Sequence, residues 1–248
     1  MNNSIELDLQ KTVADNGFAI VEQVLTGQTI EALIQAIALA QKSMFAKHRS
    51  GSMYAMRNVL KAIPAIQALA SSPRISSLAS AVLGINAYPI KAILFDKTAK
   101  ANWKVAWHQD LTIAVAAKKP VAGFGPWSEK AGIPHVQPPV EILENLLTLR
   151  IHLDDCNADN GALKVIPKSH LDGKLDSETI HSLKQTGNVH VCTAKAGDVL
   201  VMRPLLLHSS SPAVQPSHRR VLHVEYSALN LPGGLKWANS QENVAISS

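Results

Sequence analysis

The hydrophobic pattern in the first third of the chain is largely helical. From Thr26 onward, apolar residues recur at the i, i+3, i+4, i+7 spacing of one helix face: Ile30, Leu33, Ile34 and Ile37. Shorter helices are predicted over residues 64–69 and from Ser71, and an apolar run at residues 17–21 predicts one strand before them. We therefore expect a mainly helical N-terminal part over about residues 1–86.

After Ala87 the pattern changes to short apolar or alternating runs, which are typical of β-strands. These runs cover residues 88–95, 105–115, 146–153, 162–166, 189–193, 199–202 and 221–226. Turn sequences separate them, such as Ala-Asp-Asn-Gly at residues 158–161. The order predicts a mainly β fold with helices (α+β). We expect a double-stranded β-helix, a jelly roll of the cupin type, over about residues 87–230, braced by the N-terminal helices and followed by a short tail, all in one domain.

Residues 123–139, GFGPWSEKAGIPHVQPP, are rich in Gly and Pro and too long for a simple hairpin turn. Long ordered loops of this kind often cover a binding site, although a solvated loop without a role can have the same composition. We expect this segment, which carries Trp127, to act as a lid.

Composition narrows the class of protein. The 24 Lys and Arg exceed the 19 Asp and Glu by five charges, without the clustered basic run and interleaved aromatics of a nucleic-acid-binding chain. A small anionic substrate fits this mild excess better. No secretory pattern opens the sequence and no apolar stretch reaches the length of a membrane span, so we expect a cytoplasmic protein without a membrane partner. Cys156 and Cys192 are too few and too isolated for a disulfide framework or a thiolate metal site.

The sequence contains three His-X-Asp triplets, whereas chance placement of its 10 His and 10 Asp among 248 residues gives about 0.4. Side chains at i and i+2 of a strand point to the same face, so such a pair could bind one metal ion. His108 and Asp110 lie in the predicted strand 105–115, and His152 and Asp154 end the strand 146–153. The third pair, beginning at His170, follows Ile-Pro-Lys-Ser in a loop and is weaker. The pattern alone leaves the first two pairs open.

A 2-His-1-carboxylate triad for Fe(II) needs a second histidine and leaves three coordination positions open. His208 is the best placed, because it closes the apolar run VLVMRPLLLH before a Ser-rich loop. His218 adjoins two arginines, whose charge opposes metal binding, and His223 lies in the middle of a predicted strand.

An arginine is the natural partner for the carboxylate of a cosubstrate, because its planar fork can donate two parallel hydrogen bonds. In the predicted strand RRVLHVEY, the period of two places Arg219, His223 and Glu225 on one polar face. Arg220 lies on the other face, which is otherwise apolar and is expected to pack on the helices. The polar face suits a barrel interior that holds a charged ligand, so we select Arg219.

These residues carry a family resemblance. His108-X-Asp110, then His208, then Arg219 eleven positions later, resembles the phytanoyl-CoA dioxygenase (PhyH-like) family of Fe(II)/2-oxoglutarate-dependent oxygenases. Supporting segments span most of the chain: GFAIVEQVL, ILFDKTAKANWKVAWHQD, LTLRIHLDDCNADNGALKVIPKSH and AGDVLVMRPLLLHSSSPA. The resemblance implies that His108, Asp110 and His208 hold the iron, and that the segment containing His152 is a structural hairpin.

The resemblance also implies contacts to the cosubstrate 2-oxoglutarate. Arg219 would pair with its distal carboxylate and would belong to the catalytic set with the three metal ligands. The remaining contacts would fall on Ile93, Trp127, Ser210 and, for a basic residue upstream, Arg57. The family's namesake substrate is not transferred, because no basic cluster for a coenzyme A phosphate stands out.

The resulting hypothesis is an enzyme that uses Fe(II), 2-oxoglutarate and O2 to hydroxylate, or otherwise oxidise, an unactivated C–H of a small metabolite, with release of succinate and CO2. The presence of Asp110 favours oxidation over halogenation, because related halogenases have a small residue there. Arg150 and Trp127 are candidates for contacting the substrate, and a buried structural role for Arg150 is the alternative. Two other functions fit less well: a non-catalytic jelly roll that binds a small ligand, and a zinc hydrolase on the same His/Asp/His site. The sequence indicates no oligomeric state.

Overall fold

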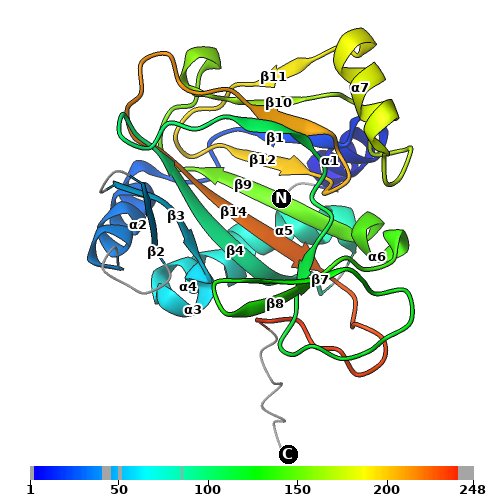
Figure 1. Ribbon diagram of the computed structural model, residues 1–248. Helices are drawn as coiled ribbons and strands as arrows, with labels where there is room; N and C mark the ends of the chain where they lie inside the picture. Colours follow the sequence, from blue (N-terminus) through cyan, green and yellow to red (C-terminus); the bar gives the residue numbers. More distant parts are fainter. Residues whose placement is uncertain (1–2, 41–45, 50–51, 85, 240–248) are drawn as a thin grey trace, which may run out of the picture.

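The computed structural model describes residues 3–40, 46–49, 52–84 and 86–239. Its largest element is a seven-stranded antiparallel sheet with the order β1-β12-β9-β14-β4-β3-β2 (Figure 1). In that order its strands are β1 (Phe18–Val21), β12 (Val199–Met202), β9 (Leu146–His152), β14 (Arg219–Ser227), β4 (Tyr88–Lys97), β3 (Ser52–Arg57) and β2 (Ala46–Arg49).

A four-stranded sheet with the order β11-β10-β13-β5 lies against the inner face of the large sheet. Its strands are β11 (His190–Cys192), β10 (Leu163–Val165), β13 (His208–Ser210) and β5 (Val105–His108). Buried side chains from both sheets, including Leu163, Val165, Leu200 and Met202, form one cluster between them. Two facing antiparallel sheets make the predicted jelly roll, and the expected α+β fold class is confirmed.

Helices from the N-terminal part cover the outer face of the large sheet (Figure 1). They are α1 (Asn3–Asn16), α2 (Gly27–Ala40), α3 (Val59–Ala62), α4 (Pro64–Ser71) and α5 (Pro73–Leu83). Three further short elements lie elsewhere: α6 (Val140–Glu144), the 3-10 turn η1 (Ala158–Asn160) and α7 (Ser177–Thr186). The largest hydrophobic cluster joins these N-terminal helices to the outer face of the sheet, so the site is left to the interior between the two sheets.

The two faces of β14 differ as the period of two predicts. Leu222, Val224 and Tyr226 lie in the cluster beneath the helices, and the Tyr226 hydroxyl donates to the Ala70 carbonyl at 2.8 Å. Arg219 and His223 belong to the opposite face and are also buried. Burial of polar side chains on that face means that the interior of the jelly roll is charged.

Three expectations about secondary structure are wrong in detail. Residues 105–115 form no single strand, because β5 ends at His108 and the two-residue β6 (Ile113–Ala114) pairs with a different sheet. His208 was expected at the end of a strand and before a loop, but it begins strand β13. β1 was predicted, but the N-terminal part is less helical than expected, since β2 and β3 also belong to it and extend the large sheet.

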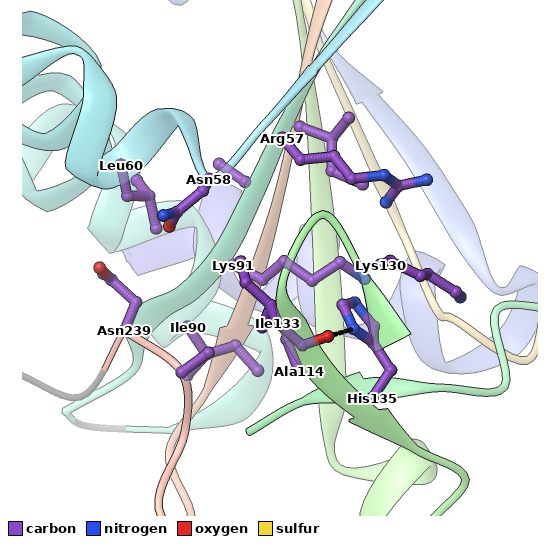
Figure 2. A pocket seen from close by; sticks show the side chains of 13 residues that line it. Arg57, Asn58, Leu60, Ile90, Lys91, Ala114, Lys130, Ile133, His135 and Asn239 are labelled. Atoms are coloured by element: carbon purple, nitrogen blue, oxygen red, sulfur yellow. Dashed lines mark hydrogen bonds between the residues drawn. The ribbon is translucent and has the colours of Figure 1, made fainter. Parts of the chain in front are cut away.

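The Gly- and Pro-rich segment 123–139 contains a hairpin. β7 (Trp127–Lys130) and β8 (Ile133–Val136) pair with each other, and β8 pairs with β6. The turn between them uses two residues with left-handed backbone, Ala131 and Gly132. The hairpin lies beside β4, and side chains from both line a pocket (Figure 2). Whether the segment acts as a lid stays a prediction.

Candidate metal centre

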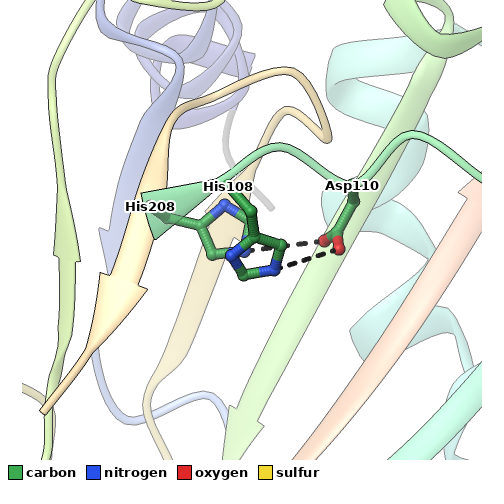
Figure 3. A group of neighbouring side chains, drawn as sticks. All are labelled: His108, Asp110 and His208. Atoms are coloured by element: carbon green, nitrogen blue, oxygen red, sulfur yellow. Dashed lines mark ion pairs between the residues drawn. The ribbon is translucent and has the colours of Figure 1, made fainter. Parts of the chain in front are cut away.

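Pairing of β5 with β13 brings the two predicted histidine ligands together. His108 and His208 are direct cross-strand partners, and their ring centroids are 4.2 Å apart. Asp110 follows the end of β5, where its backbone N–H donates to the Pro204 carbonyl at 2.9 Å. Figure 3 shows the carboxylate facing both imidazoles, with 3.8 Å from each Nε2 to the nearer carboxylate oxygen. The three residues therefore converge through a strand pair and the loop after β5, whereas we expected Asp110 to lie on the same strand as His108.

The hydrogen bonds of both histidines leave Nε2 free to bind a metal. The Nδ1 atom of His108 lies 2.9 Å from the Ala106 carbonyl, and that of His208 lies 2.8 Å from the Leu206 carbonyl. A carbonyl only accepts, so each Nδ1 carries the proton and each Nε2 presents its lone pair. Two lone pairs facing a carboxylate at 3.8 Å make no hydrogen bond, whereas a cation between them would satisfy all three groups.

The electrostatics of the cluster agree with this assignment. Burial alone would raise the pKa of Asp110, but positive charge on the protonated forms of His208, His223 and His108 outweighs this effect and holds the pKa below its usual range. Burial lowers the pKa of His208 to about 4, so its imidazole is neutral at pH 7. Within the described part of the chain, Asp110 Oδ2 is buried without a hydrogen-bond donor. A neutral imidazole and an ionised, unpartnered carboxylate are the forms that bind a divalent cation.

His223 lies close to the centre, yet its hydrogen bonds favour a supporting role. Its Nε2 atom is 3.9 Å from Asp110 Oδ2 and 3.4 Å from Glu225 Oε1. Arg150 Nη1 lies 3.1 Å from His223 Nδ1, and because a guanidinium only donates, this nitrogen is the acceptor. Neutral His223 then carries its proton on Nε2 and directs it at the carboxylates. Arg150 is buried and reaches Asp110 through His223.

The rival ligand pairs are engaged elsewhere. Asp154 accepts two hydrogen bonds from the Arg220 side chain, at 2.6 and 2.8 Å. It also accepts one from the Arg220 backbone N–H at 2.7 Å. His170 Nε2 lies 3.0 Å from the Ala14 carbonyl, and His218 pairs with Asp96 at 2.9 Å. Among the described residues, the one group with metal-ligand geometry is His108, Asp110 and His208.

A second polar cluster lies deeper in the jelly roll, four residues along β14 from His223. Arg219 is the cross-strand partner of Lys97. Arg219 Nη1 donates to the Gly161 carbonyl, and Lys97 Nζ donates to Ser210 Oγ at 2.7 Å and to the Ser211 carbonyl at 2.6 Å. Burial and the charge of Arg219 lower the pKa of Lys97 to about 7. Neither cation has an Asp or Glu partner among residues 3–40, 46–49, 52–84 and 86–239, and Arg219 Nε is buried without an acceptor there.

The remaining residues predicted from the sequence lie in different places. Ile93 is buried on the inner face of β4, opposite His223. Arg57, on β3, is the cross-strand partner of Ile93. Burial lowers the pKa of Arg57, and the charges of Tyr54 and Glu225 act in the opposite direction. Trp127 packs in a cluster at the hairpin, with Lys118 over its ring at 5.8 Å. Their predicted contacts with a cosubstrate or substrate stay predictions.

A sequence profile of the phytanoyl-CoA dioxygenase (PhyH) family matches residues 13–221. The chain belongs to this family. Membership confirms the resemblance that the motifs indicated, and with it the expectation of an oxygenase. The ectoine dioxygenase of Bordetella parapertussis is 19% identical over 257 residues, covering 92% of this chain and 77% of that protein.

Solved structures of low sequence identity share the fold of this PhyH-family chain. EctD from S. alaskensis, solved with 2-oxoglutarate and 5-hydroxyectoine, has a TM-score of 0.70 at 17% identity and covers 92% of this chain and 76% of its own. The carbocyclase SnoK from nogalamycin biosynthesis has a TM-score of 0.69 at 17% identity, with 89% and 83% covered. Such relatives differ in their reactions, so the fold alone selects no substrate.

Sequence reasoning missed several polar residues of the interior, chiefly Lys97, Lys91 and Lys130. A signal for the first two existed, because the period of two places them on the same face of β4 as Ile93. No comparable signal identified Lys130, whose position depends on the hairpin.

Within the described residues, no helix has the length and apolar character of a membrane span.

Proposed function

We propose that the chain is a non-haem Fe(II)/2-oxoglutarate-dependent dioxygenase that acts on a small molecule. The reaction would be R–H + 2-oxoglutarate + O2 → R–OH + succinate + CO2. The observation that supports it most strongly is the facing set of His108 Nε2, His208 Nε2 and Asp110, whose ligand atoms all lie within 4.8 Å of one another. Two imidazoles and one carboxylate on one side of a cation are the donor set of Fe(II) oxygenases.

The residues present fit the iron that this reaction requires. His108, Asp110 and His208 would hold it, and Asp110 Oδ2 is buried without a hydrogen bond in the described part of the chain. When bound, the iron supplies the activation of O2 and the oxidising power. Arg150 and His223 would keep the Asp110 carboxylate ionised and oriented.

The deeper cluster supports 2-oxoglutarate as the cosubstrate. Arg219 and Lys97 place a buried guanidinium beside a buried amine without a carboxylate among the described residues, and a bound anion would stabilise the charged forms of both. Arg219 would pair with the distal carboxylate through its planar fork, and the Ser210 hydroxyl, which now donates to the Gly161 carbonyl, would donate to the same carboxylate. Ile93 would pack on the carbon chain between the two ends.

Two observations separate this proposal from the alternatives. A zinc hydrolase on the same ligands leaves the buried pair of Arg219 and Lys97 without a role. A non-catalytic ligand-binding jelly roll has no need for two histidines that both present a lone pair to one carboxylate.

Fe(II) binding under anaerobic conditions tests the centre. Wild type should bind one Fe(II) per chain, and His108→Ala or His208→Ala should abolish binding. His152→Ala is the matched control, because this buried histidine lies on the inner face of β9 outside the ligand group. Loss of iron in His152→Ala with retention in His108→Ala would overturn the assignment.

A further inference from the structure

The amine of Lys97 lies in the interior of the jelly roll without a carboxylate beside it. Lys97 is 0% exposed, and no Asp or Glu pairs with it in the part of the chain that the structure describes. The neighbouring Asp96 belongs to the other face of β4, where it pairs with His218 at 2.9 Å. A positive charge on Lys97 is therefore costly unless another group compensates it.

Neighbouring groups hold this amine in place. Lys97 Nζ donates to Ser210 Oγ at 2.7 Å and to the Ser211 carbonyl at 2.6 Å. The centroid of the Trp103 ring lies 5.5 Å from Nζ. On another side Gly161 packs so closely that a Cβ atom there would lie 3.0 Å from Nζ. These contacts keep the amine in the interior and next to the other donors of the cluster.

Donors from three strands converge at this place. Arg219 Nη1, from β14, and Ser210 Oγ, from β13, both donate to the Gly161 carbonyl. Lys97 Nζ, from β4, donates to the same Ser210 hydroxyl. Arg219 Nε is buried without an acceptor among the described residues. One carbonyl oxygen thus serves donors that a carboxylate, with two oxygens, would satisfy more fully.

The charges around Lys97 act mainly to remove its proton. Burial and the charge of Arg219 lower the pKa of Lys97 to about 7, and Arg150, on β9, acts in the same direction. The thiol of Cys156, in the segment after β9, acts in the opposite direction. The other residues that touch the amine, from β13, from the turn after η1 and from the segment between β4 and β5, carry no titratable group. At pH 7 about half of the molecules therefore have a neutral amine here.

We propose that Lys97 binds the distal carboxylate of 2-oxoglutarate together with Arg219, and that its amine takes up a proton from the solvent when the cosubstrate binds. The inference rests on the proposed function, because it takes 2-oxoglutarate as the cosubstrate. Arg219 supplies a permanent charge, whereas the charge on Lys97 forms with the anion in place, as Lys97–NH2 + H+ → Lys97–NH3+. The affinity for 2-oxoglutarate therefore falls as the pH rises above about 7, because binding then requires a proton that the free protein lacks.

Calorimetric titration in buffers of different ionisation enthalpy measures this proton. The Fe(II)-loaded protein is titrated with 2-oxoglutarate under nitrogen at pH 8, in HEPES and in Tris, and the difference in heat gives the number of protons taken up. We expect an uptake of more than about 0.5 proton per bound 2-oxoglutarate. The dissociation constant should also rise at least about tenfold between pH 6.5 and pH 8.5.

Variants then assign the proton to Lys97. Lys97→Met keeps the length of the side chain and should abolish both the proton uptake and the rise of the dissociation constant with pH. Lys97→Gln, which keeps an N–H donor for Ser210, should behave in the same way. Cys156→Ser is the control for the other titratable group and should retain the uptake. Lys100→Met should retain it too, because Lys100 is an exposed lysine three positions along the chain.

Three outcomes would overturn the inference: binding of 2-oxoglutarate to wild type without proton uptake, uptake that persists in both Lys97 variants, or loss of the uptake in Cys156→Ser. Each of them includes binding of 2-oxoglutarate and leaves the proposed function standing. A Fe(II)-loaded wild-type protein that does not bind 2-oxoglutarate at any pH would contradict the proposed function itself, and the inference with it.

Discussion

Replacement of Arg219 should weaken 2-oxoglutarate binding far more than replacement of its neighbour Arg220. The two residues are adjacent, carry the same charge and lie on opposite faces of β14. Arg219 is 2% exposed and faces the interior, whereas Arg220 is bound to Asp154 on the other face. The pair therefore separates the effect of one buried guanidinium from the effect of net charge.

The size of the effect follows from the contacts. A bidentate pair with the distal carboxylate has two charge-assisted hydrogen bonds, each worth roughly 1.5–3 kcal/mol. We take the lower end, about 3 kcal/mol in total, because Arg219 must give up part of its bond to the Gly161 carbonyl and because Lys97 remains as a second cation. Arg219→Ala should then raise the dissociation constant roughly a hundredfold. Arg219→Lys keeps the charge but loses the fork, so about tenfold is expected.

The assay is calorimetric titration of the Fe(II)-loaded protein with 2-oxoglutarate under nitrogen. Arg220→Ala should change the dissociation constant less than about threefold, since the Arg220 guanidinium is bound to Asp154 on the other face of β14 and does not face the ligand. Equal losses in the two variants would show that the effect is one of net charge. An Arg219→Ala protein that binds as tightly as wild type would refute the placement of the cosubstrate.

The remaining predictions concern stability and the hairpin. Burial lowers the pKa of His135 to about 4 and that of His152 to about 3, so between those values and 6.5 the unfolded state binds more protons. The free energy of unfolding of the apo protein should therefore rise with pH over that window, by up to about 1.4 kcal/mol per pH unit for each histidine. Urea titrations at several pH values measure this rise, and it should be shallower in His152→Gln. If the 123–139 segment is a lid, proteolysis within it should slow when metal and 2-oxoglutarate bind. Trp127→Ala should then raise the fraction of 2-oxoglutarate consumed without substrate oxidation, and no change in either measurement would contradict the lid.

The sequence predicted what depends on local periodicity and failed where distant segments meet. The two faces of β14 could be predicted, because alternation along one strand is a local property. The choice of His108 over His152 could not be made from the pattern, because it depends on the pairing of β5 with β13 and on the capture of Asp154 by Arg220. In the sequence, only the family resemblance favoured His108.

The position of Lys130 is a second feature that the sequence could not predict. Its segment has the composition of a loop, and Gly and Pro conceal the short strands of the hairpin. Its nearness to Arg57 and Lys91 arises from tertiary packing that no spacing in the sequence encodes. The faces of β14 were therefore predictable from the sequence, and the position of the hairpin was not.

Release of CO2 from 2-oxoglutarate labelled at C1 tests the central claim most directly. The Fe(II)-loaded protein should release labelled CO2 and form an equal amount of succinate, slowly even without the prime substrate, and only when O2 is present. Asp110→Ala should abolish both products, because the carboxylate that faces His108 and His208 is lost. A wild-type protein that binds one Fe(II) and consumes no 2-oxoglutarate, or an Asp110→Ala protein that consumes it at the wild-type rate, would contradict the account.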